Sequence, residues 1–387
     1  MSEKIVNPDY VAEPEKMNVK KGLEGAVVDQ TTVSKVTPDT SSLIYKGYPV
    51  QELAELCRFE EVAYLLWHSE LPTKTQLADF EKKERSYRDI SKANLEVIRL
   101  LPKKCHPMDS IRTAVSFFGS EDTRIWDKSS NLDKAMLMLA KIPTMIAADY
   151  RFKKGLDFIP PNPQLSMAEN FFHMCFGKIP SADVVKAFDV SLTLYAEHSF
   201  NASTFATRVI ASTESDIYSA TVGGIGALKG PLHGGANEQV MHMMLEIADP
   251  DKAEQWMLDA LKNKRKVMGF GHRVYKYGDS RVPTMKEYAQ KMADVTGQQK
   301  WMKIYDALEK TMVTQKKIHP NLDFPAGPAY YMMGFEIDFF TPIFVMARTT
   351  GWSAHIMEQH NNNRIIRPLS EYTGAAERHV KPIQERN

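Results

Sequence analysis

The residues best suited to chemistry gather in three polar clusters in the second half of the chain. The clusters are Glu197–Thr204 (EHSFNAST), Lys229–Asn237 (KGPLHGGAN) and Lys266–Lys276 (KVMGFGHRVYK), the last followed by Arg281. Glycines follow His233 directly, and two glycines precede His272 within three residues. Glycine leaves room for a ligand to approach the backbone, and an imidazole can donate or accept a proton near neutral pH. A single histidine of this kind is more often structural, but two in the same frame indicate acid–base chemistry.

A metal site is the first rival interpretation. Such a site needs three or four ligands of suitable type and spacing. The sequence has no HExxH motif, and most of its eleven histidines are far apart. We therefore predict no metal.

A phosphate-binding loop is the second rival. The chain lacks GxxxxGK[ST], and the GxGxxG pattern that starts at Gly224 has Lys229 in place of its last glycine. Gly269 and Gly271, however, closely follow the basic run at 264–266. Basic side chains and open backbone N–H groups favour anions, so this segment could hold the phosphates of a nucleotide-like ligand. A solvated charge run beside a turn is the plain alternative.

Three arginines, Arg281, Arg348 and Arg367, lie near these clusters or in apolar surroundings. Arg348 stands in the sequence FVMARTTGW, within a stretch that is apolar on nearly every side. A buried guanidinium needs an internal carboxylate or an anionic ligand, because an unpaired buried charge is costly. Arginine holds a carboxylate through two hydrogen bonds, so several arginines together suit a di- or tricarboxylate.

Asp323 is the remaining candidate, in the Pro- and Gly-rich sequence HPNLDFPAG. An isolated aspartate in such a segment usually forms a turn or caps a helix. Only the histidines and arginines in the other clusters make it a candidate for chemistry.

Helices must position most of these residues. Apolar residues at helical spacing predict a helix over 59–67. Ser181 is suited to cap a second helix, whose apolar stripe is Val185, Phe188, Leu192 and Tyr195. Thr341 and Pro342 predict the cap and first position of a third, buried helix that runs to about Gln359.

Strands are predicted only near the N-terminus, where 33–36 and 43–45 flank turn residues at 37–40. Residues 1–20 are polar, and we predict a frayed arm there. Glycine-rich segments at 223–235 and 269–271 are expected to interrupt the helices as hinges or places of close ligand approach.

Composition indicates an ordinary globular protein and limits its possible partners. The 387 residues include 49 basic and 48 acidic side chains, 43% are hydrophobic, and the net charge of +1 gives no general field for nucleic acid. Cys57, Cys105 and Cys175 are far apart and odd in number, which indicates free, buried thiols in a reducing compartment. The first residues have no apolar signal core, and no run is long and apolar enough for a membrane span. We expect a cytoplasmic protein.

Taken together, the segments resemble the citrate synthase family, with the strongest likeness to the short bacterial 2-methylcitrate synthases and their dual-activity relatives. The matching stretches appear in the family's order: KGLEG at 21–25, YKGYPVQELA at 45–54, HSFNAST at 198–204, GALKGPLHGGANE at 226–238, VMGFGHRVYKYGDSR at 267–281, NLDFPAG at 321–327, ARTTGW at 347–352 and IRPLSEYTG at 366–374.

The resemblance implies a mainly α fold with a short β element near the N-terminus. It implies a large helical domain of residues 1–222 and 332–387, and a smaller helical domain of 223–331. The site would lie between the domains and close around its ligands. It also implies a homodimer in which Arg367 reaches the partner's site.

The resemblance further implies joining of a short acyl-CoA to oxaloacetate, with CoA as part of the substrate and no other cofactor. Asp323 would remove the proton beside the thioester, His233 would hydrogen-bond the thioester oxygen, and His272 would protonate the ketone. The residues implied in oxaloacetate binding are His198, Arg281, Arg348 and Arg367, where the ligand would supply the anion missing around the arginines. The loop implied in CoA binding is Val267, Met268, Gly269, Phe270 and Gly271. Arg85, in the short motif ERSYR, is a further candidate for a ligand contact.

One departure from the family bears on the acyl group. Many citrate synthases have an aromatic residue and a serine where this chain has Pro325 and Ala326. A smaller, less polar lining would admit the extra methyl of propionyl-CoA, and a methyl is worth about 1–3 kcal/mol in an apolar pocket. The alternatives are a housekeeping citrate synthase that uses acetyl-CoA, and a non-catalytic CoA- or carboxylate-binding protein with the same fold.

Overall fold

The computed structural model describes residues 19–275 and 277–386, so most of the predicted N-terminal arm, residues 1–18, lies outside the described residues. The chain forms two units. One is Thr31–Ile365, which holds the hydrophobic core. The other combines the residues before 31 with those from Ile366 onward, and its described part is exposed and mostly irregular, with short 3₁₀ turns at Lys21–Leu23 and Ile383–Glu385.

The larger unit is mainly α-helical, as the sequence predicts. Its α-helices are α1 (Val50–Leu56), α2 (Phe59–His68), α3 (Lys74–Ser86), α4 (Lys92–Leu100), α5 (Pro107–Glu121), α6 (Asn131–Lys153), α7 (Met167–Phe176), α8 (Ala182–Tyr195), α9 (Ala202–Ser212), α10 (Ile217–Leu228), α11 (Ala236–Ile247), α12 (Ala253–Lys262), α13 (Val282–Thr296), α14 (Lys300–Lys316), α15 (Asp323–Met332) and α16 (Phe340–Asn361). Short 3₁₀ turns lie at Lys128–Ser130, Pro250–Lys252 and Ile337–Phe339.

A small antiparallel sheet precedes the helices, where the turn chemistry predicts it. Its strands are β1 (Ser34–Thr37), β2 (Ser42–Tyr45) and β3 (Tyr48–Pro49), paired in that order. Ser34 pairs with Tyr45 and Thr37 with Ser42. The ring of Tyr45 points into the core, and its hydroxyl donates to the carbonyl of Glu197, so the sheet is tied to the end of α8.

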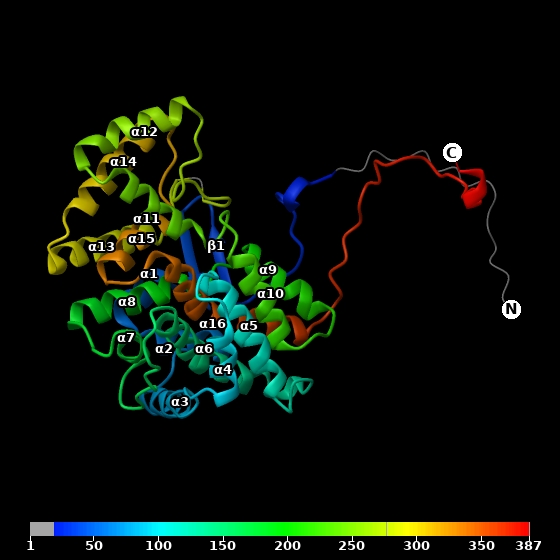
Figure 1. Ribbon diagram of the computed structural model, residues 1–387, viewed down its shortest axis with the longest axis horizontal. Helices are drawn as coiled ribbons and strands as arrows, with labels where there is room; N and C mark the ends of the chain where they lie inside the picture. Colours follow the sequence, from blue (N-terminus) through cyan, green and yellow to red (C-terminus); the bar gives the residue numbers. More distant parts are fainter. Residues whose placement is uncertain (1–18, 276, 387) are drawn as a thin grey trace. The chain divides into compact units, whose positions relative to one another are not determined.

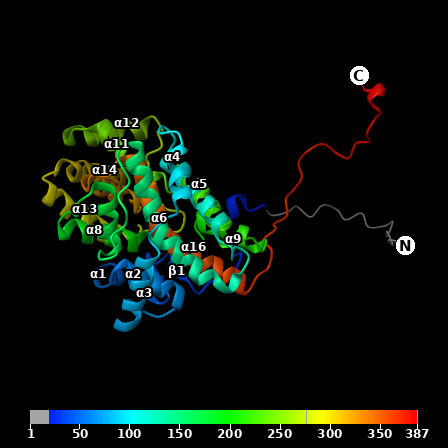
Figure 2. The ribbon, with the colours of Figure 1, turned by 60° about the horizontal axis from the view of Figure 1, so that its bottom comes forward.

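The centre of the larger unit is α16, which is buried over nearly its whole length. It packs against α6, α8, α9 and α10, and Figure 2 shows α6 and α16 side by side. This confirms the predicted buried helix. The predicted start is wrong: the helix begins at Phe340, and the Thr341 hydroxyl bonds Glu238 instead of capping the helix.

Five helices, α11 to α15, lie together at one end of the larger unit, at the upper left of Figure 1. Within this group α13 packs on α15, α11 on α15 and α12 on α14, while α13 also contacts α8. The group carries His233 just before α11 and Asp323 at the start of α15.

The predicted interruptions are confirmed at 229–235 and 269–271, which lie between helices, but the one at Gly223 is wrong, because α10 runs unbroken through it. A Cβ at Gly224 would come within 2.7 Å of Thr207 and 3.0 Å of Trp352. These glycines therefore allow α10 to pack closely on α9 and α16, and they make no hinge in the backbone. The boundary predicted between residues 222 and 223 falls inside this helix; the division into a large and a small domain stays a prediction.

Candidate functional site

The C-terminal end of α8 brings two of the predicted arginines together. The Tyr195 carbonyl accepts a hydrogen bond from Arg348 Nε at 2.7 Å, and the Leu194 carbonyl accepts one from an Arg281 Nη at 3.4 Å. Carbonyls in the last turn of a helix lack partners within the helix and carry the negative end of its dipole. The helix end therefore attracts both guanidinium groups, next to His198.

The two arginines differ in their remaining partners. Asp279 binds Arg281 through both carboxylate oxygens, at 2.9 and 2.6 Å. Burial opposes the charge of Arg281, but Asp279 holds the pKa of its guanidinium above the ordinary value. No described carboxylate lies within ion-pair distance of Arg348, one of its terminal nitrogens has no hydrogen-bond partner, and burial lowers its pKa to about 10. Arg281 is thus satisfied internally, whereas Arg348 is open to an anionic ligand.

The rings of His198 and His272 lie together beside Arg281, with centroids 5.0 Å apart. His272 Nδ1 accepts backbone N–H groups of Val274 at 3.0 Å and Tyr275 at 3.2 Å. This assigns the ring proton to Nε2. Burial lowers the pKa of His272 to about 4, and that of His198 falls well below its usual value because of burial and then Arg281. His272 is therefore a neutral donor of one N–H.

His233 is held in the opposite tautomer. The backbone N–H of Ser203, in the first turn of α9, points at Nε2 from 3.3 Å, and the Ser203 hydroxyl lies 2.8 Å from the same nitrogen. The indole N–H of Trp352 fixes that hydroxyl at 3.1 Å. Nε2 is then the acceptor and Nδ1 carries the proton. Burial, followed by Arg348 and Arg281, lowers the pKa of His233 to about 3, so this ring is also a neutral donor.

Asp323 is the first residue of α15, where its backbone N–H donates to the Asn321 side chain at 3.1 Å. The Tyr195 hydroxyl donates to one carboxylate oxygen at 2.7 Å. Burial raises the pKa of Asp323 to about 6, although the Tyr195 hydrogen bond works against the rise. The carboxylate is thus ionised at neutral pH but more basic than an exposed one.

Aromatic packing joins these groups into one site. The ring of Phe344 lies 4.1 Å from that of Tyr195 and 6.1 Å from that of His233, measured between centroids. The guanidinium carbon of Arg348 lies 4.7 Å from the centre of the Phe344 ring. His233, Arg348 and Asp323, which come from three distant parts of the sequence, therefore surround the same pair of rings.

The predicted CoA loop, 267–271, is fastened to the segment that leads into Asp323. Gly269 accepts a backbone hydrogen bond from Asn321 at 2.9 Å, Gly271 donates one to His319 at 2.8 Å, and the ring of Phe270 lies 4.4 Å from that of Phe324. Gly269 and Gly271 have φ angles of +83° and +80°, which other residues adopt only with strain. The path of the loop therefore depends on its glycines, as their spacing indicates.

Two predicted contacts are not brought into this arrangement. Arg85 lies on α3, where it pairs with Glu81 at 3.2 Å, and no contact described for it involves another predicted site residue. Arg367 is exposed and belongs to the unit formed by the two ends of the chain. Both remain predictions.

Sequence reasoning assigned no supporting role to four residues: Tyr195, Glu197, Ser203 and Asp279. Tyr195 was assigned only to the apolar stripe of α8, and nothing in the periodicity identifies its hydroxyl as a partner of Asp323. Glu197 is completely buried and accepts from Ser34 and from His355 Nε2, each at 2.9 Å. Two signals in the sequence could have identified Glu197 and Asp279. Glu197 directly precedes His198, Asp279 lies two residues before Arg281, and buried arginines need counter-charges.

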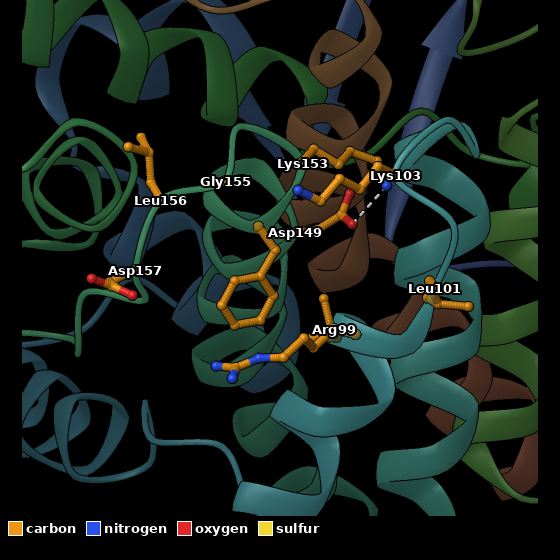
Figure 3. A pocket seen from close by; sticks show the side chains of 10 residues that line it. Arg99, Leu101, Lys103, Asp149, Lys153, Gly155, Leu156 and Asp157 are labelled. Atoms are coloured by element: carbon orange, nitrogen blue, oxygen red, sulfur yellow. Dashed lines mark hydrogen bonds and ion pairs between the residues drawn. The ribbon is translucent and has the colours of Figure 1, made fainter.

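A second group with metal-ligand chemistry, His106, Glu238 and Asp338, lies elsewhere. His106 Nδ1 accepts the Met108 N–H at 3.2 Å, which assigns the proton to Nε2, 3.1 Å from Glu238. In this structure both nitrogens of His106 are therefore occupied, one by the Met108 N–H and the other by Glu238. Figure 3 shows a separate pocket of about 220 Å³ around Asp149 and Lys153, which none of the predicted site residues lines.

Comparisons with known proteins show which proteins this chain is similar to. The family model described as citrate synthase, C-terminal domain, matches residues 22–369. A 2-methylcitrate synthase of Mycobacterium tuberculosis is 56% identical over 364 residues, 94% of this chain and 93% of the relative. A citrate synthase of Mycolicibacterium smegmatis is 56% identical over 368 residues, 95% and 98% of the two chains. The citrate synthase of Thermoplasma acidophilum, solved with carboxymethyl coenzyme A and oxaloacetate, is 34% identical with a TM-score of 0.91, covering 95% of this chain and 99% of that one.

Proposed function

The chain belongs to the citrate synthase family, and we propose that the acyl-CoA it condenses with oxaloacetate is chiefly propionyl-CoA, with acetyl-CoA as a second substrate. The protein is an enzyme of the transferase type, and the CoA thioester is itself the substrate that activates the carbon. The observation that carries the assignment of roles is the pairing of two neutral imidazoles, each with a fixed N–H, with one basic carboxylate.

In the proposed mechanism Asp323 removes the proton from the carbon beside the thioester carbonyl. The developing enolate oxygen is stabilised by the Nδ1–H of His233, which stays neutral because burial depresses its pKa. The carbon then attacks the ketone of oxaloacetate, and His272 gives its Nε2 proton to the developing alkoxide and regains a proton from water, so its ring ends the step neutral. Water hydrolyses the thioester of the adduct, which releases CoA as a thiol and the free tricarboxylate.

Arg348 is the principal oxaloacetate contact in this proposal, because its guanidinium is open. His198 and Arg281 flank it. Asp279 already pairs with Arg281, so Arg348 is the one guanidinium of the two that lacks a carboxylate partner among the described residues. A dicarboxylate with two negative charges therefore needs a further cation, which supports the proposal that Arg367 of a second copy completes the site in a homodimer.

The loop from Val267 to Gly271 is the proposed CoA contact. Its glycines have positive φ angles, and the ring of Phe270 lies next to that of Phe324, one residue beyond the base. CoA bound here would present its thioester towards Asp323. Closure of the domain 223–331 on 1–222 and 332–387 is proposed to exclude water during the reaction.

The acyl preference rests on two observations. Pro325 and Ala326 are buried directly after the base, and Ala326 lies one turn along α15 from Asp323. A relative named 2-methylcitrate synthase matches this chain over nearly its full length. The relative named citrate synthase is equally similar, which is why acetyl-CoA condensation, including a role in the tricarboxylic acid cycle, is the second candidate.

The deciding experiment measures CoA thiol release with oxaloacetate and a series of short acyl-CoA substrates. We expect kcat/KM to be higher for propionyl-CoA than for acetyl-CoA, which would suit a role in propionate metabolism. A strong acetyl preference would support the housekeeping alternative, and no release with any acyl-CoA would support a non-catalytic binding protein.

The cellular location is also part of the proposal. Cys57, Cys105 and Cys175 are free thiols, and burial raises the pKa of Cys175 above its usual value. No helix among the described residues is both long and apolar enough to cross a bilayer. The free thiols support a reducing compartment, which is the cytoplasm.

A further inference from the structure

Tyr195 takes part in both halves of the site, although the mechanism above gives it no step. Its carbonyl accepts from Arg348 Nε at 2.7 Å, and its hydroxyl donates to Asp323 Oδ1 at the same distance of 2.7 Å. The side chain is 1% exposed, and its ring packs between those of Tyr330 and Phe344. Such packing allows the hydroxyl little freedom to turn away from Asp323.

The hydrogen bond affects the two oxygens of Asp323 differently. Oδ1 is occupied by the phenol, whereas no described residue donates to Oδ2. A phenol donor to a carboxylate stabilises the ionised form and fixes the plane of the group. Oδ2 is therefore the oxygen presented to an incoming proton.

We propose that Tyr195 is the positioning residue for the base: its hydroxyl holds Oδ1 and aims Oδ2 at the substrate, while its carbonyl holds Arg348 for the other substrate. This inference rests on the proposed roles of Asp323 and Arg348. It adds that one residue sets the spacing between the base and the carboxylate contact.

Other charged groups also act on Asp323, and the test must separate them from Tyr195. Arg281, directly before α13, and Arg348, in the interior of α16, favour ionisation of Asp323. Asp279 opposes this ionisation. Burial opposes it most. Because none of these groups is altered by removing one phenol oxygen, a Tyr-to-Phe change isolates the hydrogen bond.

The experiment is the pH dependence of kcat/KM for the acyl-CoA in Tyr195→Phe. Loss of a donor to the carboxylate raises the pKa of the base, so the acid limb, expected near pH 6, should move upward by about one pH unit. The KM for oxaloacetate should stay within about twofold of wild type, because the Tyr195 carbonyl remains and Arg348 keeps its anchor.

Tyr330→Phe is the matched control. Tyr330 is a buried tyrosine on α15, with its ring 6.5 Å from that of Tyr195, but its hydroxyl donates to Ser191 at 3.0 Å. We expect its acid limb to coincide with that of wild type. An unmoved limb in Tyr195→Phe, or an equal shift in Tyr330→Phe, would overturn the inference.

A second variant guards against misfolding and tests the direction in which the acid limb shifts. Site-specific 3-fluorotyrosine at position 195 keeps the shape but makes the hydroxyl a stronger donor, so the limb should move to lower pH. A shift in the same direction as Tyr195→Phe, or none, would contradict the proposal. Failure of the wild-type enzyme to condense any acyl-CoA would instead refute the proposed function, so the two failures are distinguishable.

Discussion

The two halves of the site use opposite ends of helices. The carboxylate half, made of His198, Arg281 and Arg348, is built on the C-terminal end of α8, whose carbonyls hold the guanidinium groups. The acyl half combines the loop 267–271 with His233 and Asp323, and these two residues depend on helix N-termini. The first turn of α9 donates to His233, and α15 begins with Asp323 itself.

Burial, followed by Arg348 and Arg281, keeps His233 neutral, and burial raises the pKa of Asp323 only to about 6, so its carboxylate is ionised at neutral pH. Burial opposes the charge of both arginines, but Asp279 holds the pKa of Arg281 above its ordinary value, and that of Arg348 falls only to about 10. The helix ends favour the same protonation states, because carbonyls attract cations and N–H groups attract anions and unprotonated nitrogens. In the proposed mechanism the carboxylate half binds the negative charges that oxaloacetate already carries. The acyl half stabilises the charge that develops on the enolate oxygen during the reaction.

The largest expected effect comes from removing the base. Asp323→Asn should lower kcat by about 10³-fold, because general-base catalysis contributes about 10²–10⁴ and the amide cannot accept the proton. Oxaloacetate binding, measured by calorimetry, should be nearly unchanged if the two halves act separately. Asp79→Asn, at an exposed position of α3, is the control and should match wild type in both measurements. A large loss of oxaloacetate affinity in Asp323→Asn would mean that the halves are not separable.

Within the carboxylate half, Arg348→Gln should act mainly on binding. It removes the open guanidinium, and we expect the KM for oxaloacetate to rise about 100-fold, since a charge-assisted pair lost from a buried site costs about 2–5 kcal/mol. Thermal stability should change little, because Arg348 has no bound carboxylate to leave uncompensated. Steady-state kinetics with varied oxaloacetate, together with a melting curve, measure both quantities.

Arg281→Gln is the contrasting variant in the same half. It leaves Asp279 buried without its bidentate partner, which should destabilise the fold by about 3–5 kcal/mol. Denaturant unfolding of the two variants under identical conditions gives the comparison. Equal stabilities would show that the internal pairing of Arg281 has no energetic consequence.

The contrast between Arg281 and Arg348 also shows which features of the site could be predicted from the sequence and which could not. Residue patterns and the ordered motifs were sufficient to predict a mainly helical fold and the N-terminal sheet, while the catalytic roles of His233, His272 and Asp323 stay predictions. Motif spacing cannot tell which buried arginine has an internal partner, because that depends on the side-chain direction of Asp279. Of the two buried arginines, Arg281 has an internal carboxylate partner and Arg348 has none among the described residues, so the expectation of a ligand anion stays a prediction for Arg348 and does not apply to Arg281.

Other errors have similar physical causes. Glycines at 223 and 224 suggested a break, yet their missing side chains serve helix packing against Thr207 and Trp352. Thr341 has the residue type of a helix cap, but a buried carboxylate, Glu238, competes for its hydroxyl. In both cases tertiary contacts outweigh local propensity.

In the acyl half, Gly269→Ala tests the CoA loop. A Cβ there would meet Val240 at 2.6 Å and Phe324 at 2.9 Å, in a residue with φ of +83°. We expect the KM for acyl-CoA to rise about tenfold as the loop shifts, at a local cost of about 1–3 kcal/mol, with oxaloacetate binding retained. Gly297→Ala is the control, because it has φ of +68° and no atom within 4 Å of the added Cβ. An equal effect in both variants would assign the loss to backbone strain alone.

The smallest expected effect concerns the choice of acyl group. Ala326 is completely buried one turn after Asp323, and Ala326→Ser adds one polar atom on that side of α15. If this position lines the acyl subsite, a hydroxyl there should disfavour the extra methyl. The ratio of kcat/KM for propionyl-CoA to that for acetyl-CoA should then fall by about six- to tenfold, at the lower end of the 1–3 kcal/mol that a methyl is worth.

Ala329→Ser, at a second fully buried alanine of α15, is the matched control for that ratio. It carries the same change in volume and polarity but lies three residues farther from the base, so any loss of stability should be similar while the ratio stays constant. A ratio that falls equally in both variants would assign the effect to general repacking of α15. A ratio that falls in neither would remove Ala326 from the acyl subsite and leave the propionyl preference to other residues of the acyl half.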